Sequence, residues 1–158
     1  MRPGLAMDIG LAPEIAVTKR DLGRLKNMIA SYAPIVSWKA AEFLLQELDR
    51  ARIVDPEAIP PTTVTMDSQV EFHDALEGET RVATLAFPNE QVRYRDSLSV
   101  LEPLGTALLG LSRGQTISYT DQDGATNTIT VLNVLHQPEA GRFFRQRPRV
   151  DSAADATT

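Results

Sequence analysis

The chain contains two histidines, His73 and His136, which are the first candidates for catalysis or metal binding. Both fall in segments with the alternating pattern of β-strands, and they lie far apart in the sequence. A site in which both bind one metal stays open, but nothing in the sequence places carboxylate ligands beside them, so exposed or hydrogen-bonded strand histidines are the simpler interpretation. His73 and Asp74 are adjacent, and on a strand their side chains point to opposite faces, so they do not form a catalytic pair.

Other combinations of reactive residues are equally incomplete. No serine stands in the context of a nucleophile elbow, and the segment around Gly110 and Gly114 lacks the Lys-Ser/Thr ending of a phosphate-binding loop. Glu77 and Glu79 flank Gly78, where a solvated turn is a simpler interpretation than paired catalytic carboxylates. The chain has no cysteine, which excludes disulfides, thiolate catalysis and cysteine-bound zinc. We therefore expect a protein that is not an enzyme and that uses no metal or cofactor.

The composition suits a globular protein with one ordinary domain and an appendage, because the chain has 158 residues. Its 16 basic and 21 acidic residues give a net charge of −5, which argues against nucleic-acid binding, since that requires a clustered positive surface. The exception is the segment 142–149, RFFRQRPR, which is either a solvated tail or a flexible contact for an acidic partner. No apolar run is long enough to span a membrane, and residues 1–13 lack the features of a signal peptide, so we expect a cytoplasmic protein.

The elements that position any site divide the chain into successive parts. We predict a flexible N-terminus at residues 1–17, a helical hairpin at 18–54, a proline-rich connector at 55–62, a β-rich domain at 63–141 and a disordered tail at 142–158. The connector contains three prolines, which make it stiff and extended. The β-rich domain has the pattern of about five antiparallel strands around one short helix, which is an α+β fold.

Two helices of about 14 residues form the predicted hairpin, which makes it a short coiled coil of roughly 21 Å. Thr18 and Asp21 form a variant of the capping box at its start. The turn comes at Pro34, because the residue before a proline disfavours the helical conformation, and Ser37 can cap the second helix. The apolar stripes contain Leu22, Leu25, Ile29 and Tyr32 in the first helix, and Ala41, Leu44, Leu48 and Ala51 in the second, with Leu45 broadening the latter.

The segment 98–114, LSVLEPLGTALLGLSRG, predicts a strand followed by the short helix of the β-rich domain. Pro103 suits a first helical turn, which needs no N–H donor. The apolar stripe contains Leu104, Leu108 and Leu111, and either Gly110 or Gly114 can end the helix. Elsewhere in this domain, Phe72 lies on a half-buried strand, Val82 and Leu85 are predicted core residues of a strand over residues 80–87, and residues 121–124 form a hairpin turn.

Three stretches of the chain resemble one bacterial family. Residues 48–72, LDRARIVDPEAIPPTTVTMDSQVEF, and residues 131–141, VLNVLHQPEAG, resemble the regulator of nucleoside diphosphate kinase (Rnk) family. Residues 98–117, LSVLEPLGTALLGLSRGQTI, resemble the C-terminal domain that Rnk proteins share with the GreA and GreB transcript-cleavage factors. The resemblance covers roughly residues 15–141. It implies a short N-terminal coiled coil joined to a domain of FKBP-like topology.

The resemblance also implies a partner and a docking site. Gre factors attach to RNA polymerase beside its secondary channel through the globular domain, and the loop that enters the domain's helix takes part. That loop has the form Ser-Pro-x-Gly in Gre factors and is Glu102, Pro103, Leu104 and Gly105 here, so the proline is kept and the first position carries a charge. The family name adds a link to nucleoside diphosphate kinase, either through altered expression or through direct binding.

The end of the hairpin differs from that of Gre factors, which carry carboxylates that help to hold Mg²⁺ in the polymerase active site. Residues 31–37 contain no carboxylate, so we expect no stimulation of transcript cleavage. Tyr32, Pro34 and Trp38 lie at this end. The two aromatic residues either close the hairpin by packing on each other or contact a partner.

An alternative function is that of a peptide-binding module or weak prolyl isomerase, as the FKBP-like topology suggests. Such a site needs an apolar pocket lined by aromatic side chains. The candidates in the domain are Phe72, Phe87, Tyr94 and Tyr119. Packing in the core is the simpler interpretation of Phe72 and Tyr119.

Overall fold

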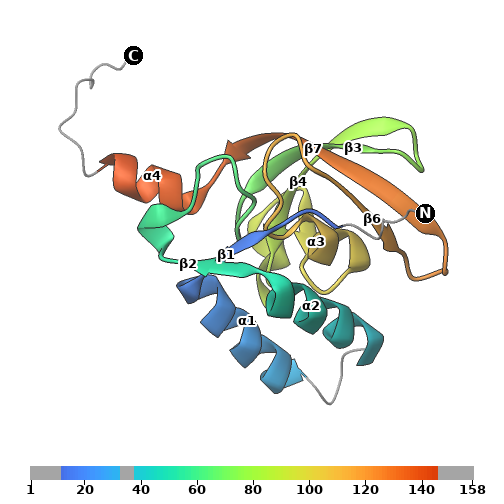
Figure 1. Ribbon diagram of the computed structural model, residues 1–158, viewed down its shortest axis with the longest axis horizontal. Coiled ribbons are helices and arrows are strands. Elements are labelled where there is room, and N and C mark those ends of the chain that lie inside the picture. Colours follow the sequence, from blue (N-terminus) through green and yellow to red (C-terminus); the bar gives the residue numbers. More distant parts are fainter. Residues whose placement is uncertain (1–11, 33–37, 146–158) are drawn as a thin grey trace.

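The computed structural model describes residues 12–32 and 38–145, and for Trp38 and residues 142–145 it describes the backbone alone. A five-stranded sheet in the order β5-β4-β3-β7-β6 curls around one short helix, α3 (Figure 1). The elements are β3 (Gln69–Asp74), β4 (Glu79–Ala86), β5 (Ser97–Ser99), α3 (Pro103–Leu108), β6 (Thr116–Thr120) and β7 (Thr126–His136). The predicted α+β class is confirmed, although β4 and β5 run parallel rather than antiparallel.

The helical hairpin consists of α1 (Lys19–Tyr32) and α2 (Trp38–Arg50). The predicted cap is present, since the backbone N–H of Asp21 donates to Thr18 Oγ1 at 3.0 Å. The buried stripes match the prediction at Leu25 and Leu44, which are 0% exposed. Leu45 is 39% exposed instead, because the residue after Leu44 is rotated about 100° away from the stripe. The predicted turn at Pro34 and cap at Ser37 lie outside the described residues.

A small parallel sheet ties the start of the hairpin to its end. The strand β1 (Ala16–Thr18) pairs with β2 (Arg52–Val54), and the N–H of Ala16 donates to the carbonyl of Gly110 at 3.2 Å. Residues 16 and 17, which we placed in a flexible N-terminus, therefore belong to a strand. The physical reason is the apolar run Ile15-Ala16-Val17, which is buried throughout.

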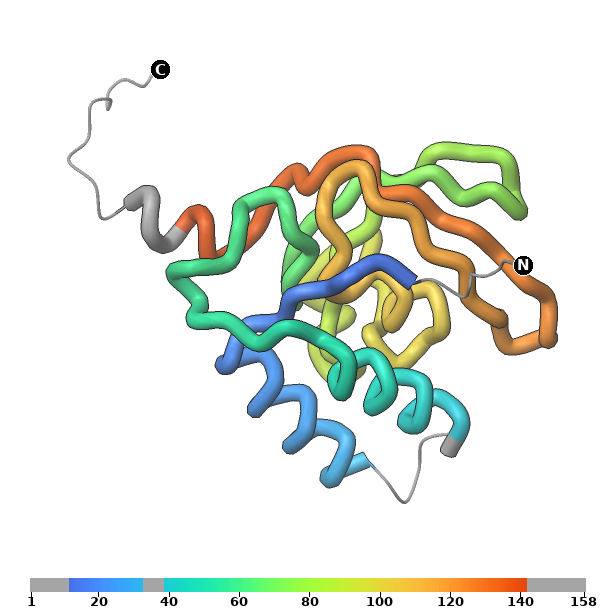
Figure 2. Tube along the Cα trace, in the orientation of Figure 1, coloured from blue at the N-terminus to red at the C-terminus, as the bar shows by residue number. Residues whose placement is uncertain are grey.

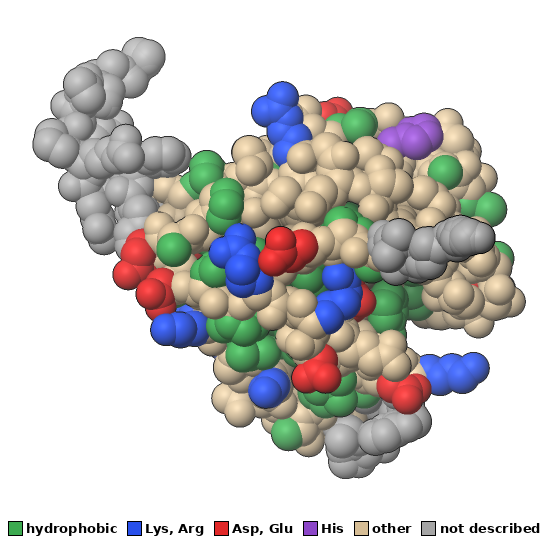
Figure 3. Space-filling view, in the orientation of Figure 1, with side chains coloured by type: hydrophobic (Ala, Val, Ile, Leu, Met, Phe, Trp, Pro, Cys, Tyr) green, Lys and Arg blue, Asp and Glu red, His purple; other side chains and the backbone are tan. Residues whose placement is uncertain are grey.

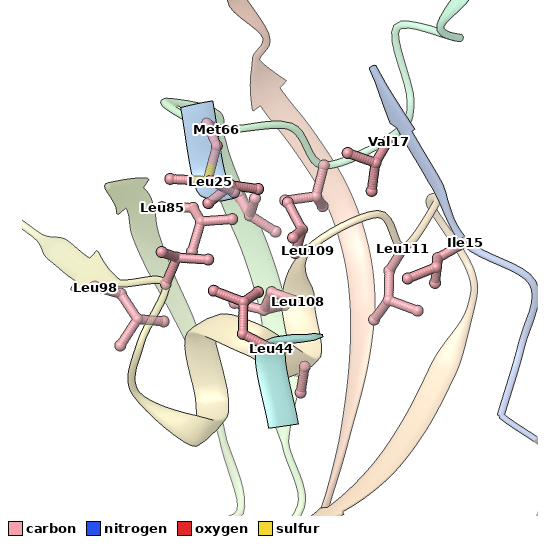
Figure 4. Packing of buried hydrophobic residues seen from close by; sticks show 14 of the residues in the cluster. Ile15, Val17, Leu25, Leu44, Met66, Leu85, Leu98, Leu108, Leu109 and Leu111 are labelled. Carbon is pink, nitrogen blue, oxygen red and sulfur yellow. The ribbon is translucent and has the colours of Figure 1, made fainter. Parts of the chain in front are cut away.

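One hydrophobic core serves both the hairpin and the β-rich domain. In the close view of Figure 4, Leu25 of α1 lies beside Met66 and Leu85, and Leu44 of α2 lies close to Leu108 of α3. The tube in Figure 2 shows the same arrangement, with the hairpin lying along the domain. The proline-rich segment contains the 3₁₀ turn η1 (Pro56–Ala58), and it does not separate two cores.

The strand β4 corrects one predicted core residue. Leu85 is 1% exposed, as predicted, whereas Val82 is 39% exposed. The two residues are three positions apart, so they point to opposite faces of a strand and cannot share its buried side. Ala83 lies on the same buried side of β4 as Leu85. Phe87, which is also buried, follows the strand and precedes the 3₁₀ helix η2 (Pro88–Arg93).

The helix α3 is held against the end of β5 by an unusually close backbone approach. A Cβ atom added to Gly105 would lie 2.0 Å from the carbonyl oxygen of Ser99, so only glycine fits at this position. The helix ends at Leu108, earlier than Gly114, and Gly110 follows with a φ of 84°, the left-handed conformation expected of a helix stop. Leu111 is buried beyond the helix rather than on it.

The buried carboxylate of Asp21 fastens α1 to the β-rich domain. Asp21 is 1% exposed, its Oδ2 accepts the backbone N–H of Met66 at 3.1 Å, and its Oδ1 accepts Arg24 Nη2 at 2.6 Å. Met66 precedes β3 by only three residues, so this carboxylate links the first turn of the hairpin to the entry of the sheet.

The chain leaves the sheet through the helix α4 (Pro138–Arg145). Gln137 Nε2 donates to the carbonyls of Pro60 at 2.7 Å and of Thr63 at 2.8 Å, and Thr65 Oγ1 donates to the buried carboxylate of Glu139 at 2.7 Å. Residues 142–145, which we placed in a disordered tail, belong to α4. Residues 146–158 lie outside the described residues. No helix within the described ranges combines the length and the apolar character needed to cross a membrane.

We predict that Asp21→Ala lowers the free energy of unfolding by about 2–3 kcal/mol, because it leaves the Met66 N–H and the Arg24 guanidinium without their shared acceptor. Chemical denaturation monitored by circular dichroism measures the change. Asp49→Ala is the matched control, since Asp49 is exposed on α2 and should change stability by less than about 0.5 kcal/mol. Equal effects of the two substitutions would contradict the fastening role of Asp21.

We predict that Gly105→Ala destabilises the protein by about 3 kcal/mol, because the new methyl group must push the backbone of Ser99 away. Gly23→Ala is the control within α1, where an added Cβ meets nothing within 4 Å. That control should stabilise the protein by roughly 0.5–1 kcal/mol, since alanine favours helices over glycine. Thermal unfolding of both variants tests the prediction, and a neutral Gly105→Ala would refute the close approach.

Candidate functional site

The turn between β5 and α3 is fixed by hydrogen bonds on both sides. Ser99 accepts the N–H of Leu101 with Oγ at 3.1 Å and the N–H of Glu102 with its carbonyl at 3.1 Å. Thr106 makes the hydrogen bonds on the other side of the turn. Its Oγ1 donates to the carbonyl of Val100 at 2.6 Å, and its N–H donates to the carbonyl of Glu102 at 2.9 Å. These hydrogen bonds restrict the backbone of the turn.

The four residues predicted for docking differ in what they present. Glu102 is exposed at the N-terminal boundary of α3, and within the described part of the chain its side chain makes no capping hydrogen bond. Pro103 and Leu104 are half-buried, and Leu104 packs against the core. Gly105 is buried against Ser99. The surface of this turn thus consists of the Glu102 carboxylate and the Pro103 ring, supported from below by Leu104 and Gly105.

The residues predicted at the end of the hairpin are only partly described. Tyr32, the last residue of α1, is half-buried and packs against the core. Pro34 lies outside the described residues. Trp38 begins α2, but its side chain is not described, so the packing of Tyr32 on Trp38 stays a prediction.

A hollow of about 350 Å³ lies between α1 and η2, and Tyr32 is one of its walls. It is lined by Arg24, Asn27, Met28, Ser31, Tyr32, Phe87, Asn89 and Glu90. Arg24 lies over the ring of Phe87, with its guanidinium carbon 4.8 Å from the ring centroid, and its Nε is buried without a hydrogen-bond partner among the described residues. Of these residues, sequence reasoning singled out Tyr32 for partner contact and missed Arg24, because the two walls are more than fifty positions apart in the chain.

The wall formed by η2 is held in place from the sheet side. Tyr94 donates its hydroxyl to Asp67 Oδ1 at 2.8 Å, and burial together with this hydrogen bond raises the pKa of the Tyr94 hydroxyl. Asp67 adopts a φ of 69°, which is uncommon for a residue with a side chain, and its N–H donates to the carbonyl of Leu85 at 2.7 Å. The hollow therefore has one wall on the hairpin and one on the β-rich domain.

Groups suited to metal binding do not converge in the described part of the chain. Residues 12–32 and 38–145 contain no group of three or more histidine, aspartate or glutamate side chains that could hold a metal ion. His73 pairs with Thr130 across β3 and β7, whereas His136 pairs with Gln69, so the two histidines lie four positions apart along β3. The two-histidine site left open by the sequence is not formed.

The aromatic side chains needed for a peptide-binding pocket are mostly used in the core. Phe72 is 0% exposed, Phe87 6% and Tyr119 8%. The Tyr119 hydroxyl accepts Asn127 Nδ2 at 3.2 Å, and burial raises its pKa. On the face shown in Figure 3, basic and acidic side chains are interspersed.

Comparisons with known proteins agree with this architecture. The family model described as the Rnk N-terminus matches residues 13–54, and the model of the C-terminal part of the transcription elongation factors GreA/GreB matches residues 59–136. The regulator of nucleoside diphosphate kinase of Escherichia coli K12 is 37% identical over 128 residues, which cover 81% of this chain and 93% of that protein. The transcription elongation factor GreA of Treponema pallidum (strain Nichols) is 25% identical over 120 residues, covering 74% and 67%.

A solved structure shows the same fold. The prokaryotic transcription elongation factor GreA/GreB from Nitrosomonas europaea superposes with a TM-score of 0.60 at 34% identity, and the match covers 78% of this chain and 99% of that one. The resemblance found in the sequence is thereby confirmed, and the relatives are named as a regulator and as elongation factors. With one family model on the hairpin and the other on the curled sheet, and with 37% identity across nearly the whole of a curated member, this chain belongs to the family of regulators of nucleoside diphosphate kinase.

Proposed function

We propose that the protein is a non-catalytic transcription regulator that binds RNA polymerase near its secondary channel. Family membership and the C-terminal fold shared with GreA/GreB factors support this role. The observation that carries the proposal is the turn Glu102–Gly105, which stands where the resemblance to Gre factors implies a docking loop. It is surface-exposed at its first residue and rigid in its backbone.

The rigidity of this turn favours binding. A loop that is already ordered loses little conformational entropy when a partner docks, so more of the contact energy appears as affinity. Pro103 adds to this effect because its ring restricts the backbone and offers a compact apolar surface. The Glu102 carboxylate makes no capping hydrogen bond among the described residues, so it is available for a basic group of the partner.

The hollow beside Tyr32 supplies a second contact in this proposal. Its lining combines the apolar atoms of Met28 and Phe87 with the polar side chains of Asn27 and Asn89. A cavity of this size can accept one large side chain of a protein partner. The proposed interface therefore has two preformed features, the turn before α3 and the hollow at the end of α1.

The proposed regulator lacks the means to stimulate transcript cleavage. The end of the hairpin, residues 31–37, carries no carboxylate. Asp21, at the opposite end of α1, is 1% exposed and already binds Arg24 and the backbone of Met66, so it cannot serve a metal ion in another molecule. The hairpin also lies along the β-rich domain rather than projecting from it (Figure 1).

The family name carries a link to nucleoside diphosphate kinase. In this proposal the link runs through transcription, so the amount of the kinase changes and no direct contact is required. A protein that occupies the polymerase without cleaving RNA would also compete with Gre factors for the same position.

We predict that Pro103→Asp weakens binding to core RNA polymerase by about tenfold or more, because it removes the ring and adds a second negative charge beside Glu102. Aspartate is accepted in the first turn of a helix, so folding should persist, which circular dichroism verifies. Co-purification with core polymerase, with and without a Gre competitor, measures binding. Arg145→Ala in α4 is the comparison variant and should bind within about twofold of the unchanged protein. The reverse ranking would identify the C-terminal basic segment as the binding element.

We predict that adding the protein to a backtracked polymerase complex leaves the RNA at its original length. Adding it together with a Gre factor should slow cleavage, with the effect increasing as the ratio of this protein to the Gre factor rises. Gel analysis of end-labelled RNA gives both results. Shortened RNA in the absence of a Gre factor would refute the non-catalytic role, and undiminished Gre-dependent cleavage at saturating protein would refute competition.

A further inference from the structure

The strand β6 (Thr116–Thr120) forms one edge of the five-stranded sheet, and half of its backbone groups face away from β7. In the ladder of β6 and β7, Ile117 lies opposite Ile129, and Tyr119 lies opposite Asn127. The N–H of Val131 donates to the carbonyl of Gln115, and the N–H of Asp121 donates to the carbonyl of Ala125. The odd-numbered residues of β6 are therefore the ones whose backbone groups are hydrogen-bonded to β7. In an antiparallel ladder such pairs alternate, so the N–H and C=O groups of residues 116, 118 and 120 point to the open edge.

Within the described residues, this edge carries none of the features that usually prevent strand pairing. Edge strands are commonly protected by proline, by charged side chains or by their shortness. The sequence Thr-Ile-Ser-Tyr-Thr has five residues and contains neither proline nor charge. The opposite edge, β5, has only three residues and is contacted by η2. Of the two edges of the sheet, β6 is thus the one suited to accept a further strand.

We propose that β6 pairs antiparallel with β6 of a second copy of this chain, around a two-fold axis at Ser118. The two five-stranded sheets then join into one. In this register Ser118 lies opposite Ser118, and Thr116 of each copy lies opposite Thr120 of the other. The outward-facing N–H and C=O groups of all three residues find partners, as a self-complementary contact between identical chains requires.

The side chains on the exposed face fit this register. The hydroxyl of Thr116 shares a hydrogen bond with Thr130 of β7, and the hydroxyl of Ser118 shares one with Thr128, at 2.8 Å each. The second copy would continue this row of small hydroxyl side chains, which form favourable cross-strand pairs and bring no like charges together. Ile117 and Tyr119 stay in the core of their own copy, since both are less than 10% exposed.

The charges at the two ends of β6 select a second copy over other occupants. Arg113 is exposed before the strand, and no ion pair of its guanidinium occurs within the described ranges. Asp123 is exposed after the strand, in a turn where Asp121 Oδ1 accepts the N–H groups of Asp123 and Ala125. Arg113 and Asp123 each lie five residues from Ser118, on opposite sides of it. In the antiparallel register, Arg113 of one copy and the Asp123 turn of the other therefore lie at the same end of the paired strands, where the long arginine side chain can form an ion pair with the carboxylate.

This association is independent of the proposed polymerase contact, because the turn Glu102–Gly105 contributes no residue to it. The interface consists of backbone hydrogen bonds, small hydroxyl side chains and two exposed ion pairs. Such a polar contact gives a reversible dimer rather than an obligate one.

Sedimentation equilibrium of the full chain at low salt tests the proposal. The unchanged protein should show a monomer–dimer equilibrium with a dissociation constant below about 1 mM. Arg113→Asp places two carboxylates together at each end of the paired strands, and Asp123→Arg places two cations there. Each substitution should raise the dissociation constant of the dimer on the order of tenfold. The double variant Arg113→Asp/Asp123→Arg restores opposite charges and should recover the association of the unchanged protein.

Two further variants separate pairing at β6 from general effects. Ser118→Pro removes an outward N–H and should abolish the dimer while leaving the circular dichroism spectrum unchanged, because proline is tolerated on a free edge. Arg95→Asp makes the same change of charge as Arg113→Asp at an exposed site near β5, and it should leave the dimer unaffected. A protein that stays monomeric at all concentrations, a double variant without recovery, or equal effects of Arg95→Asp and Arg113→Asp would each overturn the proposal.

Discussion

The position of the proposed docking turn depends on how closely α3 packs against the end of β5. The carbonyl of Ser99 occupies the space that a side chain at residue 105 would need, so the helix can approach only through glycine. With the helix in this position, Leu108 lies in the core, Glu102 is exposed and Pro103 is half-buried. Any shift of α3 would therefore move the proposed docking residues as well.

The same core determines how the hairpin lies on the β-rich domain. The buried residues of α1 and α2 belong to the same hydrophobic core as those of the β-rich domain, so the helices lie along it. The buried Asp21 carboxylate joins the first turn of α1 to Met66 before β3. In the proposed function, a helical pair that is fastened at its base and packed along the domain serves as part of the contact surface.

The two edges of the sheet divide two kinds of contact between them. At one edge, the short strand β5 leads directly into the turn before α3. At the other edge, β6 carries no charged side chain, and among the described residues its outward backbone groups face no further strand. The proposed polymerase contact uses side chains on a rigid turn, and the proposed self-association uses the backbone of a strand. Since the elements are different, one contact can change without the other.

Local features of this protein were determined by the sequence itself. The Thr18 cap, the strand that contains Phe72, the start of α3 at Pro103 and the turn at residues 121–124 all depend on neighbouring residues and formed as predicted. The proposed docking turn could be singled out in the sequence because its four residues are adjacent in the chain and resemble a family pattern. Features that join distant segments were decided only by the tertiary structure. They include the pairing of β1 with β2, the parallel pairing of β4 with β5 and the hollow between Arg24 and Phe87. The physical reason is that a cap or turn is stabilised within a few residues, while a shared wall or strand pair is stabilised only when the core brings both of its sides together.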